Sequence, residues 1–180
     1  MSQLEYTLFD TALGRCGLAW GADGLRAVSF AHPEVSETRS HLLRRAPDAM
    51  EISTPPERVL RIIEDIRKLL EGVARDLSYA QLDFEGIGGF ERDVYTLALD
   101  IKAGEMKTYG DLARALGDVS LSRRVGQALG RNPFPIIVPC HRIVGADGAM
   151  TGFSAPGGAE LKRKLLKIEG ALAPDLFDTF

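Results

Sequence analysis

Residues 136–142 read Ile-Ile-Val-Pro-Cys-His-Arg, and the surroundings of this stretch decide what its cysteine can do. The apolar run 136–138 has the composition of a buried strand, and Pro139 ends it. Glycines follow at positions 145 and 148, so the next segment is expected to be a turn. The pattern therefore predicts that Cys140 lies where a strand ends and a turn begins.

The two residues after Cys140 indicate whether its thiol is reactive. From spacing alone, a cysteine after an apolar run is most often a small buried residue, and a neighbouring histidine is most often a loop residue. Here His141 and Arg142 place two potential cations beside the thiol, a setting that favours the thiolate. We therefore predict a nucleophilic cysteine.

Composition limits the class of protein. The chain has 180 residues, 45% of them hydrophobic and 26% charged, which is typical of a soluble globular protein with one domain or two small ones. No apolar run approaches 18 residues, so no membrane span and no membrane partner are expected. The first residues lack the layout of a signal peptide, and the two widely spaced cysteines, Cys16 and Cys140, are expected to be free thiols. These features predict a cytoplasmic protein.

Charge is distributed unevenly along the chain. Residues 101–170 hold 11 Lys and Arg against 6 Asp and Glu, although the whole chain has a net charge of −3. The half that contains Cys140 is therefore mildly basic, which permits binding to a polyanion without requiring it.

The pattern of elements changes near residue 86. Alternating apolar residues predict an antiparallel meander over 6–9, 16–20 and 25–30, with a short helix around 37–45. A capping box from Thr54 to Glu57 predicts a helix that ends at Gly72 and packs on the meander, and 77–84 is expected to return as a strand or an extended link. The glycine-rich stretch 85–89 is a linker, so we expect a strand-rich domain over 1–86 and a helix-rich domain over 87–180.

Helices dominate the second half. Periodicity predicts helices over 90–102, 109–116, 122–130 and 159–168, the second of them capped by Thr108. The second and third are arranged as a helix-turn-helix, although such pairs are also common as ordinary packing. The outward face of 122–130 is expected to carry small and cationic residues that can approach a DNA duplex, namely Arg123, Arg124, Gly126 and Ala128. The last helix is expected to expose a solvated basic face, namely Lys162, Arg163, Lys164 and Lys167.

The run 130–144, Gly-Arg-Asn-Pro-Phe-Pro-Ile-Ile-Val-Pro-Cys-His-Arg-Ile-Val, resembles the active-site signature of the methylated-DNA–protein-cysteine methyltransferases, the O6-alkylguanine-DNA alkyltransferases. The resemblance is strong over 90–170 and weaker over 7–30. It implies an α/β fold, with a small ribonuclease H-like N-terminal domain and a helical C-terminal domain that carries a winged helix-turn-helix. It also implies a single-turnover DNA repair reaction. O6-alkylguanine, mainly O6-methylguanine, is flipped out of double-stranded DNA, and its alkyl group passes irreversibly to Cys140.

The same resemblance implies roles for individual residues. His141 would act on the thiol through a water, Glu169 would orient that histidine, and Asn132 would support the turn before the apolar run. Tyr109 would crowd the phosphate and bind the flipped base, while Arg124 would fill the gap in the duplex. No cofactor is implied, because the thiolate itself is consumed, and the protein is expected to be a monomer. No metal site is expected, because the histidines outside the signature, His32 and His41, have no cysteine or carboxylate at a ligand spacing.

The substrate pocket carries one departure from the family pattern. Carbonyl groups near Cys140 and Val144 would read the exocyclic amine of guanine, and Phe153 would supply an aromatic wall. The stretch 153–158 is two residues longer than usual. The role of Ser154, whose counterpart donates to O6, and the size of the alkyl group accepted therefore stay open.

Three other classes fit parts of the pattern. Alkyltransferase-like proteins bind lesions without repairing them, but they have tryptophan in the position of the cysteine. A cysteine hydrolase would normally take its histidine from a distant part of the sequence. A helix-turn-helix regulator would bind DNA without chemistry. A Cys140→Ala variant that binds DNA but repairs nothing would separate the enzyme from a binding protein.

Overall fold

The first half of the chain forms a four-stranded sheet in the order β3-β2-β1-β4. The computed structural model describes residues 2–151 and 153–175. The strands are β1 (Glu5–Thr11), β2 (Gly14–Gly21), β3 (Gly24–Ser29) and β4 (Met50–Glu51). The meander predicted from alternation is confirmed, since β1 pairs with β2 and β2 with β3, both antiparallel. The two-residue strand β4, parallel to β1, was not predicted.

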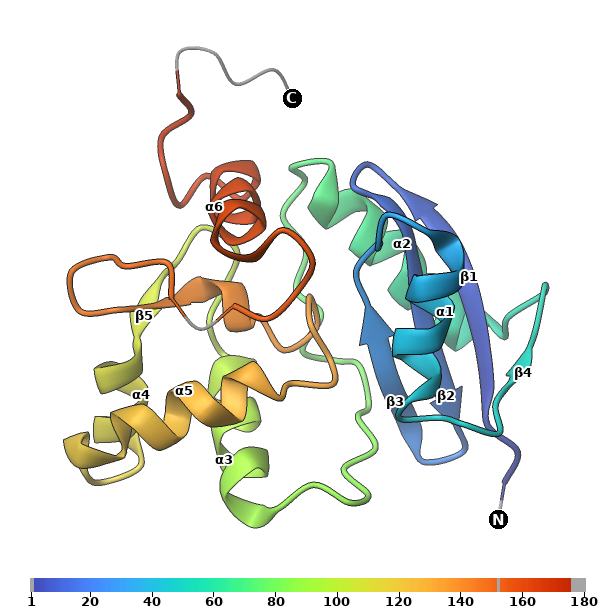
Figure 1. Ribbon diagram of the computed structural model, residues 1–180, viewed down its shortest axis with the longest axis horizontal. Helices are drawn as coiled ribbons and strands as arrows, with labels where there is room; N and C mark the ends of the chain where they lie inside the picture. Colours follow the sequence, from blue (N-terminus) through green and yellow to red (C-terminus); the bar gives the residue numbers. More distant parts are fainter. Residues whose placement is uncertain (1, 152, 176–180) are drawn as a thin grey trace.

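Two helices cover the opposite faces of this sheet (Figure 1). The helix α1 (Val35–Leu43) buries Leu42 against Tyr6, Leu8 and Ala19, and α2 (Glu57–Leu70) covers the face that carries Phe9 and Leu18. Because neighbouring strand residues point to opposite faces, Leu8 and Phe9 belong to different layers.

The predicted start of α2 is wrong. Thr54 does not cap this helix, which begins at Glu57 after Pro56, with no side-chain cap. Two consecutive prolines at 55 and 56 keep the preceding residues extended, because a residue before proline is disfavoured in the helical region. The predicted end near Gly72 is confirmed, since Glu71 is the C-cap and Gly72 takes a φ of 91°.

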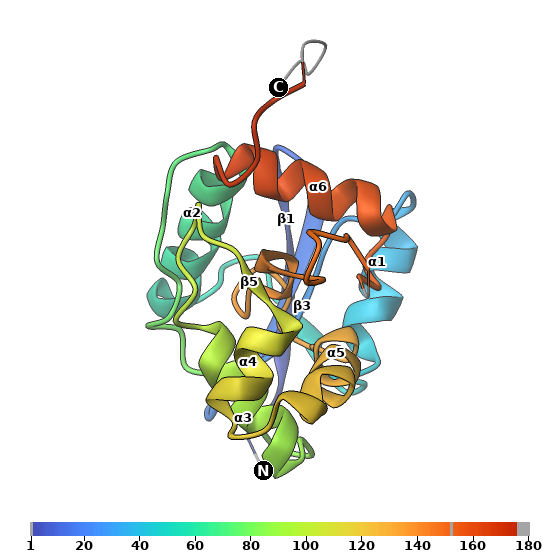
Figure 2. The same ribbon diagram turned by 90° about the vertical axis from the view of Figure 1, so that its left-hand side faces the viewer.

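The second half is mainly helical (Figure 2). Its elements are α3 (Gly89–Ala98), β5 (Lys107–Thr108), α4 (Tyr109–Ala115), α5 (Ser122–Gly130), β6 (Ile143–Val144) and α6 (Gly158–Ile168). Two single turns of 3-10 helix are added, η1 (Val119–Leu121) and η2 (Cys140–Arg142). Thr108 caps α4 as predicted, in a reciprocal pair of hydrogen bonds with Asp111. The predicted helix over 90–102 is too long, since α3 ends at Ala98.

The apolar run before Cys140 is not a strand. Residues 134–138 form a buried turn in which Ile136 has a φ of 75°, a left-handed conformation that is rare for a β-branched residue. The side chain of Asn132 forms hydrogen bonds with the backbone at both ends of this turn. Its Nδ2 donates to the carbonyl of Val138 at 2.9 Å, and its Oδ1 accepts from the N–H of Phe134 at 2.9 Å. These bonds satisfy backbone groups that a strand would have paired in a sheet.

The two halves share one hydrophobic core. Residues of the α2 face of the sheet and residues of α3, α5 and the turn before Cys140 belong to the same buried cluster. The N–H of Val28 in β3 also donates to the carbonyl of Pro133 at 2.9 Å. This packing fixes Cys140 in the region where the two halves meet. Over the described ranges 2–151 and 153–175, no helix is long and apolar enough to span a membrane.

Candidate active site

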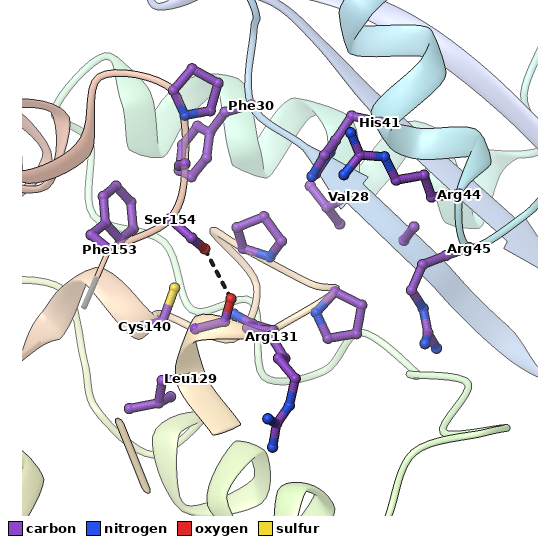
Figure 3. A pocket seen from close by; sticks show the side chains of 17 residues that line it. Val28, Phe30, His41, Arg44, Arg45, Leu129, Arg131, Cys140, Phe153 and Ser154 are labelled. Atoms are coloured by element: carbon purple, nitrogen blue, oxygen red, sulfur yellow. Dashed lines mark hydrogen bonds between the residues drawn. The ribbon is translucent and has the colours of Figure 1, made fainter. Parts of the chain in front are cut away.

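Cys140 opens the η2 turn, and its residue is 9% exposed. Its side chain lines a cavity, with Sγ on the same side as Ser154 and Phe153 (Figure 3). Burial raises the pKa of the Cys140 thiol above its ordinary value, and a hydrogen bond from Asn132 and the charge of Lys162 act in the opposite direction. The thiol therefore depends on its neighbours to ionise near neutral pH.

His141 and Glu169 form a buried pair on one side of the cysteine. The Nε2 atom of His141 lies 2.7 Å from Oε1 of Glu169, and both side chains are at most 2% exposed. Burial lowers the pKa of His141, although Glu169 opposes this, so the ring is neutral at pH 7. A carboxylate only accepts hydrogen bonds, so Nε2 carries the ring proton and Nδ1 is left as the basic nitrogen. Nδ1 is buried and has no hydrogen-bond partner within the described part of the chain.

Arg142 binds the same carboxylate. Its Nε donates to Oε2 of Glu169 at 2.9 Å and its Nη2 donates to Oε1 at 2.8 Å, while Nη1 donates to the carbonyl of Ile101 at 2.6 Å. Burial alone would raise the pKa of Glu169, but hydrogen bonds from His141 and Arg142 outweigh it and lower the pKa to about 2. The expectation that His141 and Arg142 place two cations beside the thiol is therefore wrong. The histidine is neutral, and the guanidinium is bound to Glu169.

The cation that acts on Cys140 comes from α6. Lys162, predicted to be solvated, is 1% exposed and lies on the inner face of the helix with Leu165 and Leu166. Its Nζ donates to the carbonyl of Thr151 at 3.1 Å and to the hydroxyl of Tyr109 at 3.4 Å. Burial lowers the pKa of Lys162 to about 8, partly opposed by the charge of Cys140. Among the described residues the ammonium has no carboxylate partner, which is rare for a buried lysine.

Tyr109 stands at the start of α4, close to this lysine. Its hydroxyl donates to the carbonyl of Thr151 at 2.6 Å, and the Nζ atom of Lys162 lies 5.6 Å from the centre of its ring. Burial raises the pKa of Tyr109. The structure thus brings Tyr109, Cys140 and Lys162 together from three separate elements.

The helix α5 holds four of the five predicted DNA-binding residues, and the fifth, Tyr109, begins α4. Arg123 and Arg124 are exposed on α5, and the guanidinium of Arg124 lies 4.0 Å from the ring centre of Phe90. Gly126 faces Tyr109, since a Cβ atom at this position would lie 3.8 Å from the tyrosine ring. The outward position predicted for Ala128 is wrong. Ala128 is fully buried, and its carbonyl accepts a hydrogen bond from Tyr95 in α3, because this side of α5 packs inside the domain.

The remaining predicted pocket residues are Phe153, Ser154 and Val144. Phe153 packs edge-on against Phe30 with ring centres 6.1 Å apart, and the hydroxyl of Ser154 donates to the carbonyl of Gly130 at 2.9 Å. Both residues line the cavity beside Cys140. Val144 is buried in β6 and pairs with Thr108.

Two residues of this site were missed from the sequence, Arg142 as the partner of Glu169 and Lys162 as the buried cation. A signal for Lys162 was available. Positions 162, 165, 166 and 169 recur at helical spacing, so a lysine at 162 shares a face with two buried leucines and with Glu169.

Comparison with known proteins agrees with this geometry. Residues 89–171 match the model of the family described as 6-O-methylguanine DNA methyltransferase, DNA binding domain. A methylated-DNA–protein-cysteine methyltransferase of Methanothermobacter thermautotrophicus is 33% identical over 154 residues, which are 86% of this chain and 78% of the relative. The crystal structure of the Mycobacterium tuberculosis O6-methylguanine methyltransferase is 30% identical and has a TM-score of 0.73, covering 98% of this chain and 100% of that one.

A crystal structure of Mycobacterium tuberculosis OGT in complex with DNA is 29% identical with a TM-score of 0.71 and covers 93% of each chain. The fold is a mixed α/β arrangement of the kind seen in these structures. The chain belongs to the methylated-DNA–protein-cysteine methyltransferase family, which confirms the resemblance in the sequence.

Proposed function

We propose that this protein repairs DNA by transferring the alkyl group of an O6-alkylguanine, mainly O6-methylguanine, to its own Cys140, once per molecule. The observation that carries the proposal is the position of Cys140. The thiol lines a cavity, and it is close to a neutral histidine bound to a buried carboxylate and to a buried lysine that has no carboxylate partner in the described structure. Such a site can remove the thiol proton on one side and stabilise the thiolate on the other.

The His141–Glu169 pair supplies the base. A water molecule between Sγ and Nδ1 of His141 passes the thiol proton to the ring, and Glu169 stabilises the imidazolium that forms. The His141 ring keeps its orientation because Glu169 is in turn held by Arg142. In this proposal Arg142 is a positioning residue, since it acts through the carboxylate.

The transfer itself is a displacement at the carbon attached to O6. The thiolate sulfur forms a bond to this carbon, the carbon–oxygen bond breaks, and guanine keeps the electron pair. Guanine then takes up one proton, so the thiol proton is in effect exchanged for the alkyl group. The ammonium of Lys162 and the hydroxyl of Tyr109 stabilise the negative charge that develops on the base. Phe153, Ser154 and the backbone near Val144 form the rest of the base pocket, and Asn132 holds the turn that presents Cys140.

Binding to duplex DNA is assigned to α4 and α5. Arg124 fills the place of the flipped base, Arg123 contacts phosphate, and Gly126 lets the helix approach closely. We further propose that residues 1–86 form a ribonuclease H-like domain and that residues 87–180 form a domain with a winged helix-turn-helix. The protein acts as a monomer in the cytoplasm and needs no cofactor, because the alkyl acceptor is part of the chain.

The DNA product gives the first test. A duplex with one O6-methylguanine is mixed with the protein, and the loss of the lesion is followed over time. We expect one lesion repaired per protein molecule and then no further reaction. A Cys140→Ser variant should bind the duplex and repair nothing, and its affinity should fall as salt rises. Repair by this variant, or repair that exceeds one lesion per molecule, would contradict the proposal.

A further inference from the structure

The side chain of Arg124 in α5 lies against the first turn of α3, a helix that packs beside α5 (Figure 1). The guanidinium carbon of Arg124 is 4.0 Å from the ring centre of Phe90, the second residue of α3. At this distance the cation rests on the face of the aromatic ring, where it is attracted by the ring electrons. We call this placement of Arg124 on Phe90 the resting position.

A carboxylate adds to the attraction of α3 for this arginine. Glu91 follows Phe90 in the first turn of α3 and accepts a hydrogen bond from Nη2 of Arg131 at 2.9 Å. A hydrogen bond from its own backbone N–H is the largest of the effects that lower the pKa of Glu91, and the charges of Arg131 and Arg124 lower it further. The side chain of the neighbouring Arg123 has no hydrogen bond or ion pair within the described part of the chain. The contact with α3 therefore distinguishes Arg124 from Arg123.

The resting position is incompatible with insertion into a duplex. A guanidinium group is planar and has two faces. When Arg124 fills the place of a flipped base, neighbouring bases cover both of these faces, whereas in the resting position Phe90 covers one of them. Arg124 must therefore leave Phe90 before it can enter the stack of bases, and whatever stabilises the resting position opposes insertion by the same free energy.

We propose that Phe90 is a positioning residue that holds Arg124 on α3 and so restricts its insertion to base pairs that are already weakened. The inference rests on the function proposed above, in which Arg124 fills the gap left by the flipped base. Leaving Phe90 costs the same free energy at every base pair, whereas flipping costs least at a damaged or mismatched base. Insertion is thus favourable at a lesion and unfavourable at intact pairs.

Rates of methyl transfer test this role of Phe90. The second-order rate constant is measured with protein in excess but below saturation, on a duplex with one O6-methylguanine and on the lesion strand alone. This constant compares unbound protein and DNA with the transition state, so it includes the loss of the Phe90 contact. Phe90→Leu keeps an apolar residue against the core and removes the aromatic face. We expect it to react about 2–5-fold faster on the duplex, equivalent to about 0.5–1 kcal/mol, and equally fast on the single strand, where no pair is opened.

A double-mutant cycle shows whether the effect passes through Arg124. In an Arg124→Ala background, Phe90→Leu should change the duplex rate by less than about 1.5-fold, because the ring then has no guanidinium to hold. Tyr79→Leu is the matched control. It removes another ring that carries an arginine, since the guanidinium of Arg61 lies 4.1 Å from the centre of Tyr79, and it should leave both rates unchanged.

Insertion at intact pairs is measured on an undamaged duplex that contains 2-aminopurine, whose fluorescence rises when the base leaves the stack. At saturating protein, the fluorescence increase should be about 2-fold larger with Phe90→Leu than with the wild type, because the released arginine enters intact DNA more often. The variant that combines Phe90→Leu with Arg124→Ala should not show this additional increase. An equal signal from Phe90→Leu and the wild type would overturn the proposed restriction.

The outcomes separate the two proposals. A duplex rate of Phe90→Leu that is unchanged or slower, or a faster rate that persists without Arg124, would overturn the role of Phe90 while methyl transfer continues. Failure of the wild type to transfer the methyl group from either substrate would instead overturn the proposed function. The single-strand rate reports whether Phe90→Leu has folded, and Phe90→Met, with the same expected results, replaces it if it has not.

Discussion

Two buried cations lie near Cys140, and they differ in their hydrogen-bond partners: one is bound to a carboxylate and the other is not. Arg142, on one side, makes two hydrogen bonds to the carboxylate of Glu169. Lys162, on the other side, makes hydrogen bonds only to a carbonyl and a hydroxyl within the described structure. A paired buried cation holds its neighbours in place, whereas an unpaired one destabilises the fold and attracts negative charge. The comparison predicts that the Arg142 side stabilises the fold while it orients His141, whereas the Lys162 side destabilises the fold and serves the proposed reaction by its charge.

Removing the carboxylate on the Arg142 side should have the largest effect. Glu169→Ala leaves a buried guanidinium without its partner, so the free energy of unfolding should fall by about 3–5 kcal/mol. Chemical denaturation measures this change, with Glu160→Ala as control, because Glu160 is an exposed residue of the same helix. A loss below about 1 kcal/mol in Glu169→Ala would show that the pairing contributes little to stability.

Acid should remove the same contribution in the wild type. The pKa of Glu169 is lowered to about 2 from an ordinary 4.5, so its stabilisation is present above pH 4.5 and disappears as the pH falls towards 2. A shift of this size corresponds to roughly 3 kcal/mol. Unfolding measured at pH 5 and at pH 3 should therefore differ more in the wild type than in Glu169→Gln. Equal differences would mean that Glu169 does not titrate as the pairing requires.

The Lys162 side should respond in the opposite direction. Lys162→Met removes an unpaired buried charge, so at pH 7 the free energy of unfolding should rise by about 1–2 kcal/mol while alkyl transfer slows about 10-fold. Because the lowered pKa of Lys162 means that it loses its proton above about pH 8, the gain in stability should shrink between pH 8 and 10.5. Lys164→Met, at an exposed position of α6, should change neither quantity. If Lys162→Met is instead less stable than the wild type, Lys162 stabilises the fold and this prediction is wrong.

The smallest expected effect is on the thiol itself. Without the ammonium of Lys162, the pKa of Cys140 should rise further above its ordinary value, since a nearby cation favours the thiolate. The rate of alkylation by iodoacetamide at different pH values measures this shift, with Cys16→Ser as the background so that one thiol reacts. An unchanged profile in Lys162→Met would show that the two groups do not interact.

Much of this arrangement could be predicted from local sequence. Thr108 and Asp111 form a capping box three residues apart, and the resemblance to the family assigned roles to Cys140, His141, Asn132 and Glu169. The capping box depends on residues that are close in the chain. The role of Glu169, which is distant from Cys140 in the sequence, came from the resemblance to the family.

The parts that could not be predicted depend on contacts between distant residues. The apolar composition of 136–138 predicted a strand. In the structure the side chain of Asn132 instead pairs with backbone groups of Phe134 and Val138, and Ile136 adopts a left-handed conformation. A lysine is normally solvated, and the burial of Lys162 follows from the packing of α6 over Tyr109 and residue 151. The cavity is also formed by both halves of the chain, so neither half alone indicates it.

The most direct test is the mass of the intact protein after reaction with a duplex that contains one O6-methylguanine, followed by mapping of the modified residue. We expect one added CH2 per molecule, located at Cys140 and absent in Cys140→Ser. An unchanged mass together with tight binding to the lesion would contradict it, and would make the protein a lesion-binding protein whose buried cysteine is unreactive.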